Sequence, residues 1–250
     1  MWKIPCLLFA LFFLSIHSLC AEELSGTEIV RRADQIMIGD SAEYESIMII
    51  ERPGKDDLVS KYVTYFKERG QKVLVRILHP PREVGKDLLL IGENMWQNIP
   101  NVEKSVRIAG SQRFMGGDFN NTDLLKVSLV NDYSAVLIDT VQIENVECYY
   151  LELKAKKAGT TYDQVHYWVR TDGFIPFREE YITVSGKKMK SLTYSDIGKL
   201  DNRTRPKKLT MVNSLRPTHR TTVTILKAEY DKTLSDNLFT RTYLERKRYR

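Results

Sequence analysis

The sequence predicts a mainly β (α+β) fold, in which short helices cover one curled antiparallel sheet of about eleven strands. Two observations predict this fold class. Runs in which apolar and polar residues alternate recur at short spacing along most of the chain, and turn residues separate them. Helical periodicity is confined to short segments near the start, the middle and the end. Since a single antiparallel sheet of this size must curl, it has a concave face that the helical segments can cover.

Residues 1–20 are predicted to be an export signal that is not part of the fold. Their apolar run, Leu7–Leu14, is too short to span a membrane, which takes about 20 residues. Cleavage is expected after Cys20 or Ala21, and acylation of Cys20 is an alternative that would anchor the protein to a membrane. No linker rich in Pro, Gly or Ser divides the remainder, so residues 21–250 are expected to form one domain.

The chain carries a formal net charge of +6, and basic residues gather at Arg31-Arg32 and in the C-terminal tail. Because the chain is expected to be exported, nucleic acid is not expected as a partner. Anionic lipid head groups are the expected electrostatic partner, and a solvated helical face is the alternative. The tail residues concerned are Arg241, Arg246, Lys247, Arg248 and Arg250.

The first predicted element is an amphipathic helix from Thr27 to Ile38, ended by Gly39. Ser25 and Glu28 before it have the spacing of a capping box. Apolar residues recur at helical spacing at Ile29, Val30, Ala33, Ile36 and Met37, and the residues expected on the opposite face are Arg31, Arg32, Asp34 and Gln35. We expect the apolar face to lie on the sheet.

Six predicted strands then follow one another with short turns between them, which is typical of antiparallel neighbours. They are Tyr44–Ile50, Val59–Lys67, Gln71–Leu78, Lys86–Ile91, Met95–Ile99 and Lys104–Ile108. The alternation resumes at Tyr133–Thr140 and continues to about Tyr230, and a short basic helix is expected after Asp236–Phe239. Polar members of the alternation are expected on the outer, solvated face, for example Lys61, Arg76, Glu152, Lys154 and Gln164.

The segment Phe114–Leu125 interrupts the strands, and its two adjacent glycines indicate a sharp turn. Asn121 or Thr122 is expected to cap a short helix that begins at Asp123. No strand periodicity would bury the apolar side chains of this segment, so we predict that it is a lid on the sheet. The alternative is ordinary core filling. The candidate lid and lipid-binding residues are Met95, Trp96, Phe114, Met115, Gly116, Gly117, Phe119 and Leu124.

The sequences of four segments, and their order along the chain, are typical of a known protein family. The segments are Ile77–Arg82, Leu89–Pro100, Phe114–Phe119 and Leu234–Thr240. The chain resembles the outer membrane lipoprotein-sorting protein family, relatives of the periplasmic lipoprotein carrier LolA. The resemblance covers essentially the whole mature chain. It implies an incomplete β-barrel wrapped around helices, an apolar cavity that holds acyl chains, and a periplasmic setting. Members usually have Ser where this chain has Gly117, a difference expected to make the loop more flexible.

No catalytic constellation stands out in the sequence. The histidines beyond the signal, His79, His166 and His219, are not spaced as a zinc pair, and neither a nucleophile elbow nor a phosphate loop is present. Cys148 lacks a neighbouring basic residue that would activate its thiol, so we expect it in the core. The chain is therefore predicted to be no enzyme and to use neither a cofactor nor a metal.

The function expected from these observations is non-enzymatic binding of lipid or lipoprotein, with acylated cargo carried toward the outer membrane. The alternative is a sensor or adaptor of the same fold, which binds a protein partner or serves a lipid-exporting pump. An inner-membrane transporter is a further expected partner.

Overall fold

The computed structural model describes residues 24–126 and 128–246. The predicted signal with Cys20, and the tail residues Lys247, Arg248 and Arg250, lie outside this range. None of the described helices is long and apolar enough to cross a membrane.

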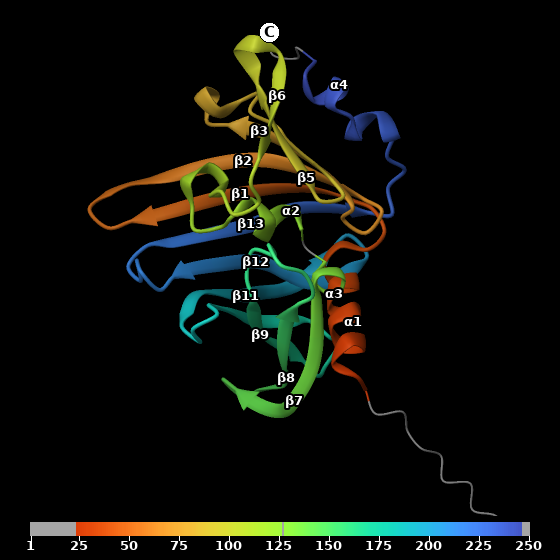
Figure 1. Cartoon of the computed structure of the whole chain (residues 1–250), viewed down its shortest axis with the longest axis vertical. Coiled ribbons are helices and arrows are strands. Elements are labelled where there is room, and N and C mark those ends of the chain that lie inside the picture. The colour runs from red at the N-terminus through yellow and green to blue at the C-terminus, as the bar shows by residue number, and fades with distance from the viewer. Residues whose placement is uncertain (1–23, 127, 247–250) are drawn as a thin grey trace, which may run out of the picture.

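The described residues form one antiparallel sheet of thirteen strands (Figure 1). The strands are β1 Ala42–Arg52, β2 Lys55–Lys67, β3 Lys72–His79, β4 Leu88–Ile91, β5 Asn94–Ile99, β6 Lys104–Ile108, β7 Tyr133–Ile143, β8 Val146–Ala155, β9 Gln164–Arg170, β10 Pro176–Ile182, β11 Lys188–Leu200, β12 Arg203–Asn213 and β13 Arg220–Tyr230. The predicted fold class is confirmed, with thirteen strands where about eleven were expected.

The spatial order is β6-β5-β4-β3-β2-β1-β13-β12-β11-β10-β9-β8-β7. Strands that are consecutive in the chain are therefore adjacent in the sheet, with the exception of β6 and β7. The pairing of β1 with β13 joins the first and last strands in the middle of the sheet. The two edges are β6 and β7, which are consecutive in the chain and are not paired with each other. Residues 109–132, which we call the β6–β7 connection, therefore link the two edges of an unclosed barrel.

The helical segments are few and short. They are the α-helices α1 Gly26–Ile38, α2 Asn121–Leu125, α3 Leu129–Asp132 and α4 Arg241–Leu244, and the 3-10 helices η1 Pro81–Glu83, η2 Pro100–Val102, η3 Phe114–Gly116 and η4 Asp236–Phe239. The helix predicted at 27–38 and the basic helix near the C-terminus are both present as α1 and α4. The helix of the β6–β7 connection is capped by Asn120, one residue before the predicted position.

Helix α1 begins and ends as its sequence predicts. The Ser25 side chain accepts a hydrogen bond from the amide of Glu28, and Gly39 ends the helix with a φ of 60°. The Glu28 carboxylate binds Arg31 and Arg32 instead of returning to the cap. The helix contacts α3, β7, β9 and β12, so it lies along one half of the sheet, as Figure 1 shows.

The main hydrophobic core lies on the face of the sheet that carries α1 and the β6–β7 connection. Alternation along each strand selects its members: on β3, Val73, Val75 and Ile77 are at most 1% exposed and belong to this core. Cys148 is also fully buried, as predicted, and burial raises the pKa of its thiol to about 11.

The opposite face of β3 and β4 is covered rather than solvated, which corrects the expectation for Arg76. Its side chain donates a hydrogen bond of 2.6 Å to the Tyr243 hydroxyl and lies over the rings of Tyr65 and Tyr243. A second hydrophobic cluster, here called the convex cluster, consists of Leu74, Leu89, Leu234, Phe239 and Leu244. The C-terminal segment with η4 and α4 therefore covers this part of the outer face.

Candidate functional site

A cavity of about 520 Å³ lies between the concave face of the sheet, α1 and the β6–β7 connection. Its exposed end is formed by Glu93, Ser111 and the β8–β9 loop at residues 157–160. Its inner end is formed by buried side chains of α1, β9, β10, β11 and β12. The cavity therefore runs from the gap between the two sheet edges into the core.

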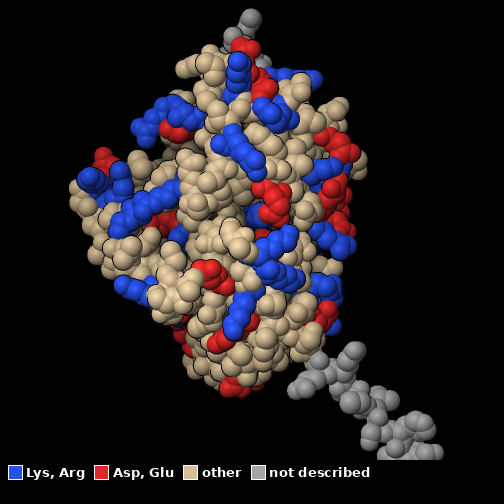
Figure 2. Space-filling model, viewed as in Figure 1, with Lys and Arg blue, Asp and Glu red and all other residues tan. Residues whose placement is uncertain are grey.

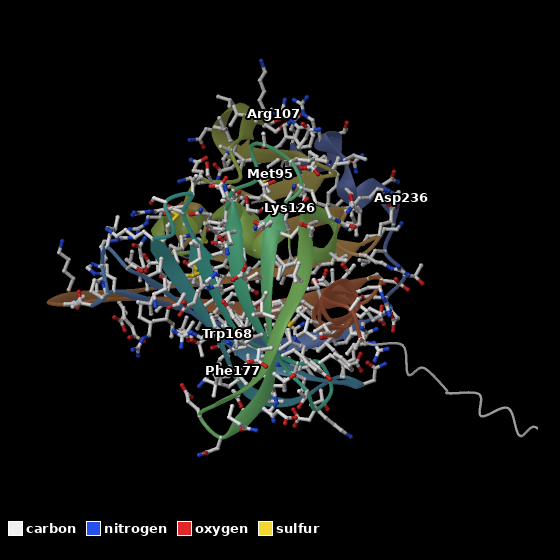
Figure 3. All side chains as sticks on the ribbon, turned by 60° about the horizontal axis from the view of Figure 1, so that its bottom comes forward. Met95, Arg107, Lys126, Trp168, Phe177 and Asp236 are labelled. Carbon is white, nitrogen blue, oxygen red and sulfur yellow. The ribbon has the colours of Figure 1, made fainter. Side chains whose placement is uncertain are left out.

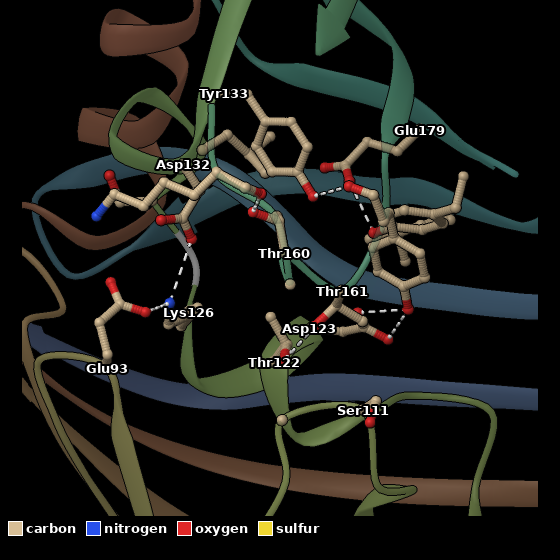
Figure 4. Close-up of a pocket in the computed structure, with 18 of the residues that line it drawn as sticks. Glu93, Ser111, Thr122, Asp123, Lys126, Asp132, Tyr133, Thr160, Thr161 and Glu179 are labelled. Atoms are coloured by element: carbon tan, nitrogen blue, oxygen red, sulfur yellow. Dashed lines mark hydrogen bonds and ion pairs between the residues drawn. The ribbon is translucent and has the colours of Figure 1, made fainter. Parts of the chain in front are cut away.

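Lys126 binds acidic side chains from both halves of the sheet at the mouth of this cavity (Figure 4). Its ammonium group contacts Glu93, on the β4–β5 turn, and lies 3.5 Å from a carboxylate oxygen of Asp132, just before β7. The ammonium group also holds the pKa of Glu93 below its usual range. Lys126 thus joins the two halves across the mouth, near Met95 of the cavity wall (Figure 3).

Two carboxyl groups lie at the inner end. The Asp34 carboxylate accepts hydrogen bonds from the Ser128 hydroxyl (2.9 Å) and the Val130 amide (3.0 Å). The Glu179 carboxylate accepts hydrogen bonds from the hydroxyls of Tyr181 (2.7 Å) and Tyr194 (2.5 Å). Burial raises the pKa of Asp34 to about 7 and also raises the pKa of Glu179. The inner end is therefore acidic, and its carboxyl groups have uncharged donors.

Tyrosine rings make up much of the wall. The tyrosines that line the cavity are Tyr133, Tyr162, Tyr167, Tyr181 and Tyr194. The larger apolar side chains that share the wall are Met37, Met95, Ile108, Leu129, Leu192 and Leu209. Such a wall offers large apolar area together with polar groups at fixed places, as small-molecule sites usually do.

Buried polar contacts fix the β6–β7 connection to the sheet. The Asp118 carboxylate binds Arg216 (2.6 Å) and the hydroxyl of Thr221 (3.0 Å) on β13. The Asp123 carboxylate accepts hydrogen bonds from the Tyr162 hydroxyl (2.8 Å) and from Lys190 of β11 (3.2 Å). The connection is thus attached to β13, the central strand of the sheet, and to β11.

The predicted lid residues are mostly part of the core. Phe114 and Phe119 are 1% and 0% exposed, and the ring of Phe114 packs edge-on against Tyr62 of β2. Met115 and Leu124 are half-buried against the same core. The expectation that the aromatic rings of this segment are left exposed is wrong, because residues 114–125 lie on the concave face instead of projecting from it.

The two glycines of this segment have different roles. Gly116 has a φ of 81°, and a side chain there would meet open space. Gly117 has an ordinary φ, but a Cβ atom would lie 3.0 Å from the Cγ2 atom of Thr221 and 3.5 Å from Ile50. Gly117 therefore allows a close approach of the connection to β13.

Met95 and Trp96 lie on opposite faces of β5. Met95 is 4% exposed and lines the cavity. Trp96 packs against the convex cluster, with the Arg241 guanidinium 6.0 Å from its ring centre. Because successive side chains of a strand alternate between faces, the two residues cannot share one site, and Trp96 is not at the mouth. Among the eight predicted residues, only Met95 lines the cavity.

The sequence analysis did not find the acidic residues of the inner end. Asp34 was expected opposite the apolar face of α1, but it is 7% exposed and faces the cavity, one turn after Val30. The burial of Glu179 could have been predicted from its position two residues before Tyr181, because alternate residues of a strand face the same side and both residues face inward on β10. No group of three or more His, Cys, Asp or Glu side chains suited to a metal ion occurs within the described ranges.

The basic tail is only partly described. Arg241 binds Ser105 and Glu245 on the outer face, and the Arg246 guanidinium lies 6.0 Å from the Tyr243 ring centre. Figure 2 shows Lys and Arg side chains interspersed with Asp and Glu over the face in view. The expected membrane-binding role of these arginines stays a prediction.

A family model with the description "Uncharacterized protein" matches residues 69–246. No curated protein matches the sequence. A LolA superfamily protein from Nitrosomonas europaea is similar in structure, with a TM-score of 0.80 and 25% identity over 88% of this chain and 99% of that chain. A DUF1329 family protein from Desulfovibrio piger has a TM-score of 0.77 and 27% identity over 88% and 97% of the two chains. An outer membrane lipoprotein-sorting protein domain from Vibrio parahaemolyticus has the same fold, with a TM-score of 0.78 and 19% identity over 88% and 98%.

Proposed function

Because this chain belongs to the LolA-like family, we propose that it is a non-enzymatic carrier that holds acyl chains of lipids or lipoproteins in its cavity. The cavity itself is the observation that carries the proposal. Its volume of about 520 Å³ falls within the range of about 300–1,000 Å³ that is usual for sites of small ligands.

The wall of the cavity suits a chain of methylene groups. Six aliphatic side chains and five tyrosine rings line it, and two of the aliphatic side chains are methionines, which adapt to flexible ligands. Each methylene group that moves from water into such a wall stabilises the complex by about 0.8 kcal/mol. An acyl chain can therefore bind here without forming a covalent bond or using a catalytic group.

The proposed setting is the periplasm, with cargo carried toward the outer membrane. The predicted export signal and the lipoprotein-sorting description of the Vibrio parahaemolyticus domain support it. An inner-membrane transporter would supply the cargo. Arg241 and Arg246 would bring the carrier to anionic lipid, together with Lys247, Arg248 and Arg250.

The test is whether delipidated protein takes up an acyl ligand. Mass spectrometry of gently purified protein should detect a bound acyl compound. Delipidated protein should bind a fluorescent fatty acid at a ratio of one to one. Protein that is recovered empty and binds neither a fluorescent fatty acid nor an uncharged or cationic single-chain amphiphile would overturn the carrier proposal.

A second candidate, an adaptor that binds a protein partner, is favoured by the edge strand β7. Val136 and Ile138 on this strand are 60% and 48% exposed, and an unpaired strand edge can pair with a strand of another protein. Replacing both side chains with lysine should abolish function in cells and leave acyl binding intact if this candidate is correct.

A further inference from the structure

The inner end of the cavity holds two acidic groups without a cation. Asp34 and Glu179 are 7% and 4% exposed, and both line the cavity. Their hydrogen-bond donors within the described residues are three hydroxyls and the backbone amides of Leu129 and Val130, and none of these carries a charge. The nearby charge of Glu179 also raises the pKa of Asp34. Buried carboxyl groups are usually paired with a cation, because an unpaired buried charge is costly.

Other acidic groups of the connection and the mouth are paired. Asp123 is bound by Lys190, Asp118 by Arg216, and Glu93 and Asp132 by Lys126. Among these acidic residues, therefore, only Asp34 and Glu179 at the inner end lack a cationic partner. General acidity of the protein does not account for it, since the chain is basic overall.

Tyr167 adds a second, independent feature at the same place. Its side chain is 2% exposed and lines the cavity, and its hydroxyl forms no hydrogen bond to any described residue. Burial raises the pKa of this hydroxyl, and the nearby charges of Glu179 and Asp34 raise it further. Because Tyr167 lines the cavity, its hydroxyl can form a hydrogen bond with a bound ligand.

We propose that the inner end binds the primary ammonium group of an amphiphile, whose alkyl chain extends along the cavity toward the mouth. The proposal rests on the proposed function and names the class of its cargo. An ammonium group has three N–H donors and one positive charge. Asp34, Glu179 and the Tyr167 oxygen offer three acceptors and the opposite charge, and the surrounding tyrosine rings favour a cation further. Met37, Leu192 and Leu209 of the cavity wall would contact the first methylene groups.

Isothermal titration calorimetry at pH 7.5 with three single-chain probes tests this proposal: dodecylamine and dodecanoate below their micellar concentrations, and dodecanol below its solubility limit. We expect the wild-type protein to bind dodecylamine at least tenfold more tightly than dodecanol, and dodecanoate most weakly. Asp34→Asn, Glu179→Gln and Tyr167→Phe should each weaken dodecylamine binding several-fold and leave dodecanol binding unchanged. Circular dichroism and the melting temperature establish that each variant is folded, and the three variants give independent readings.

Glu93→Gln is the matched control, because Glu93 lines the same cavity at its mouth. It should leave the preference for the amine intact. Equal affinity for dodecylamine and dodecanol, or a preference that only Glu93→Gln removes, would overturn the ammonium subsite and leave the carrier proposal standing. If none of the three probes binds, the carrier proposal fails together with the subsite.

Discussion

Lys190 of β11 and Asp123 of α2 form an ion pair that is almost completely buried. The Nζ and Oδ2 atoms lie 3.2 Å apart, and the two side chains are 6% and 1% exposed. The Tyr162 hydroxyl donates to Asp123 and accepts a hydrogen bond from Lys190, so three side chains form one network. This network attaches the β6–β7 connection to the half of the sheet that forms the inner cavity.

Replacing Lys190 with methionine should lower the free energy of unfolding by about 3–5 kcal/mol, because Asp123 would then be buried without a cation. Lys188→Met is the matched control. Lys188 lies two residues away on the same strand, its side chain is 44% exposed, and its ion pair with Glu180 is worth at most about 1 kcal/mol. Denaturant unfolding of both variants measures the difference. Equal losses would show that the Asp123–Lys190 pair does not hold the connection in place.

The place of the connection could be predicted from the sequence only in part. The glycines and the break in alternation indicated an irregular segment between two blocks of strands, and that is where it lies. The burial of Phe114 and Phe119 could not be predicted, because it depends on contacts with strands far away in the sequence. Tyr62 packs against Phe114 and the Thr221 hydroxyl accepts a hydrogen bond from the neighbouring Asp118 amide, and no local pattern identifies either residue as a partner.

Gly26 is a second position where a single substitution is expected to lower the free energy of unfolding. A Cβ atom there would lie 2.7 Å from the amide nitrogen of Leu137 and 2.8 Å from the carbonyl oxygen of Ala135. Gly26→Ala should therefore lower the free energy of unfolding by about 1–3 kcal/mol, although alanine is the better helix former. Thr27→Ala, at an exposed position of the same turn, should change it by less than about 0.5 kcal/mol. A Gly26→Ala variant as stable as the wild type would show that α1 can shift on β7.

The free energy of unfolding should depend on pH through the titration of Asp34. Burial raises its pKa from 3.8 to about 7, so between these values the folded state binds more protons than the unfolded state. Stability then falls as the pH rises from about 4 to about 7, by at most about 4 kcal/mol for this group. Asp34→Asn removes this contribution, so the variant should be more stable than the wild type at pH 8 and similar to it at pH 4.

Unfolding curves between pH 4 and pH 8 measure this effect. Part of the decline should persist in Asp34→Asn, because burial also raises the pKa of Glu179 and Asp123. Glu144→Gln on the exposed β7–β8 turn should retain the wild-type profile. A profile for Asp34→Asn that is identical to the wild-type profile would mean that Asp34 is ionised in the fold.

The acidic site illustrates what sequence periodicity cannot resolve. The pattern on α1 predicted the helix and most of its buried face, but it assigned Asp34 to the solvent because a carboxylate is usually exposed. Only the assembled fold brings Ser128 and the Val130 amide next to it. The cavity follows from the same assembly, because its wall combines α1, seven strands from both halves of the sheet, and the β6–β7 connection itself.

Met95 and Trp96 provide the most direct test of the cavity, because they are adjacent in the chain and lie on opposite faces of β5. Met95→Gln places an amide in the cavity wall and should weaken dodecanol binding roughly tenfold, since the amide must give up water when the chain binds. Trp96→Gln should leave dodecanol affinity unchanged and lower the melting temperature, because Trp96 packs against the convex cluster. Calorimetry and thermal unfolding of both variants separate affinity from stability. If both variants lose affinity in proportion to their lost stability, the ligand does not occupy the cavity beside Met95, and the acyl site must be sought elsewhere on the protein.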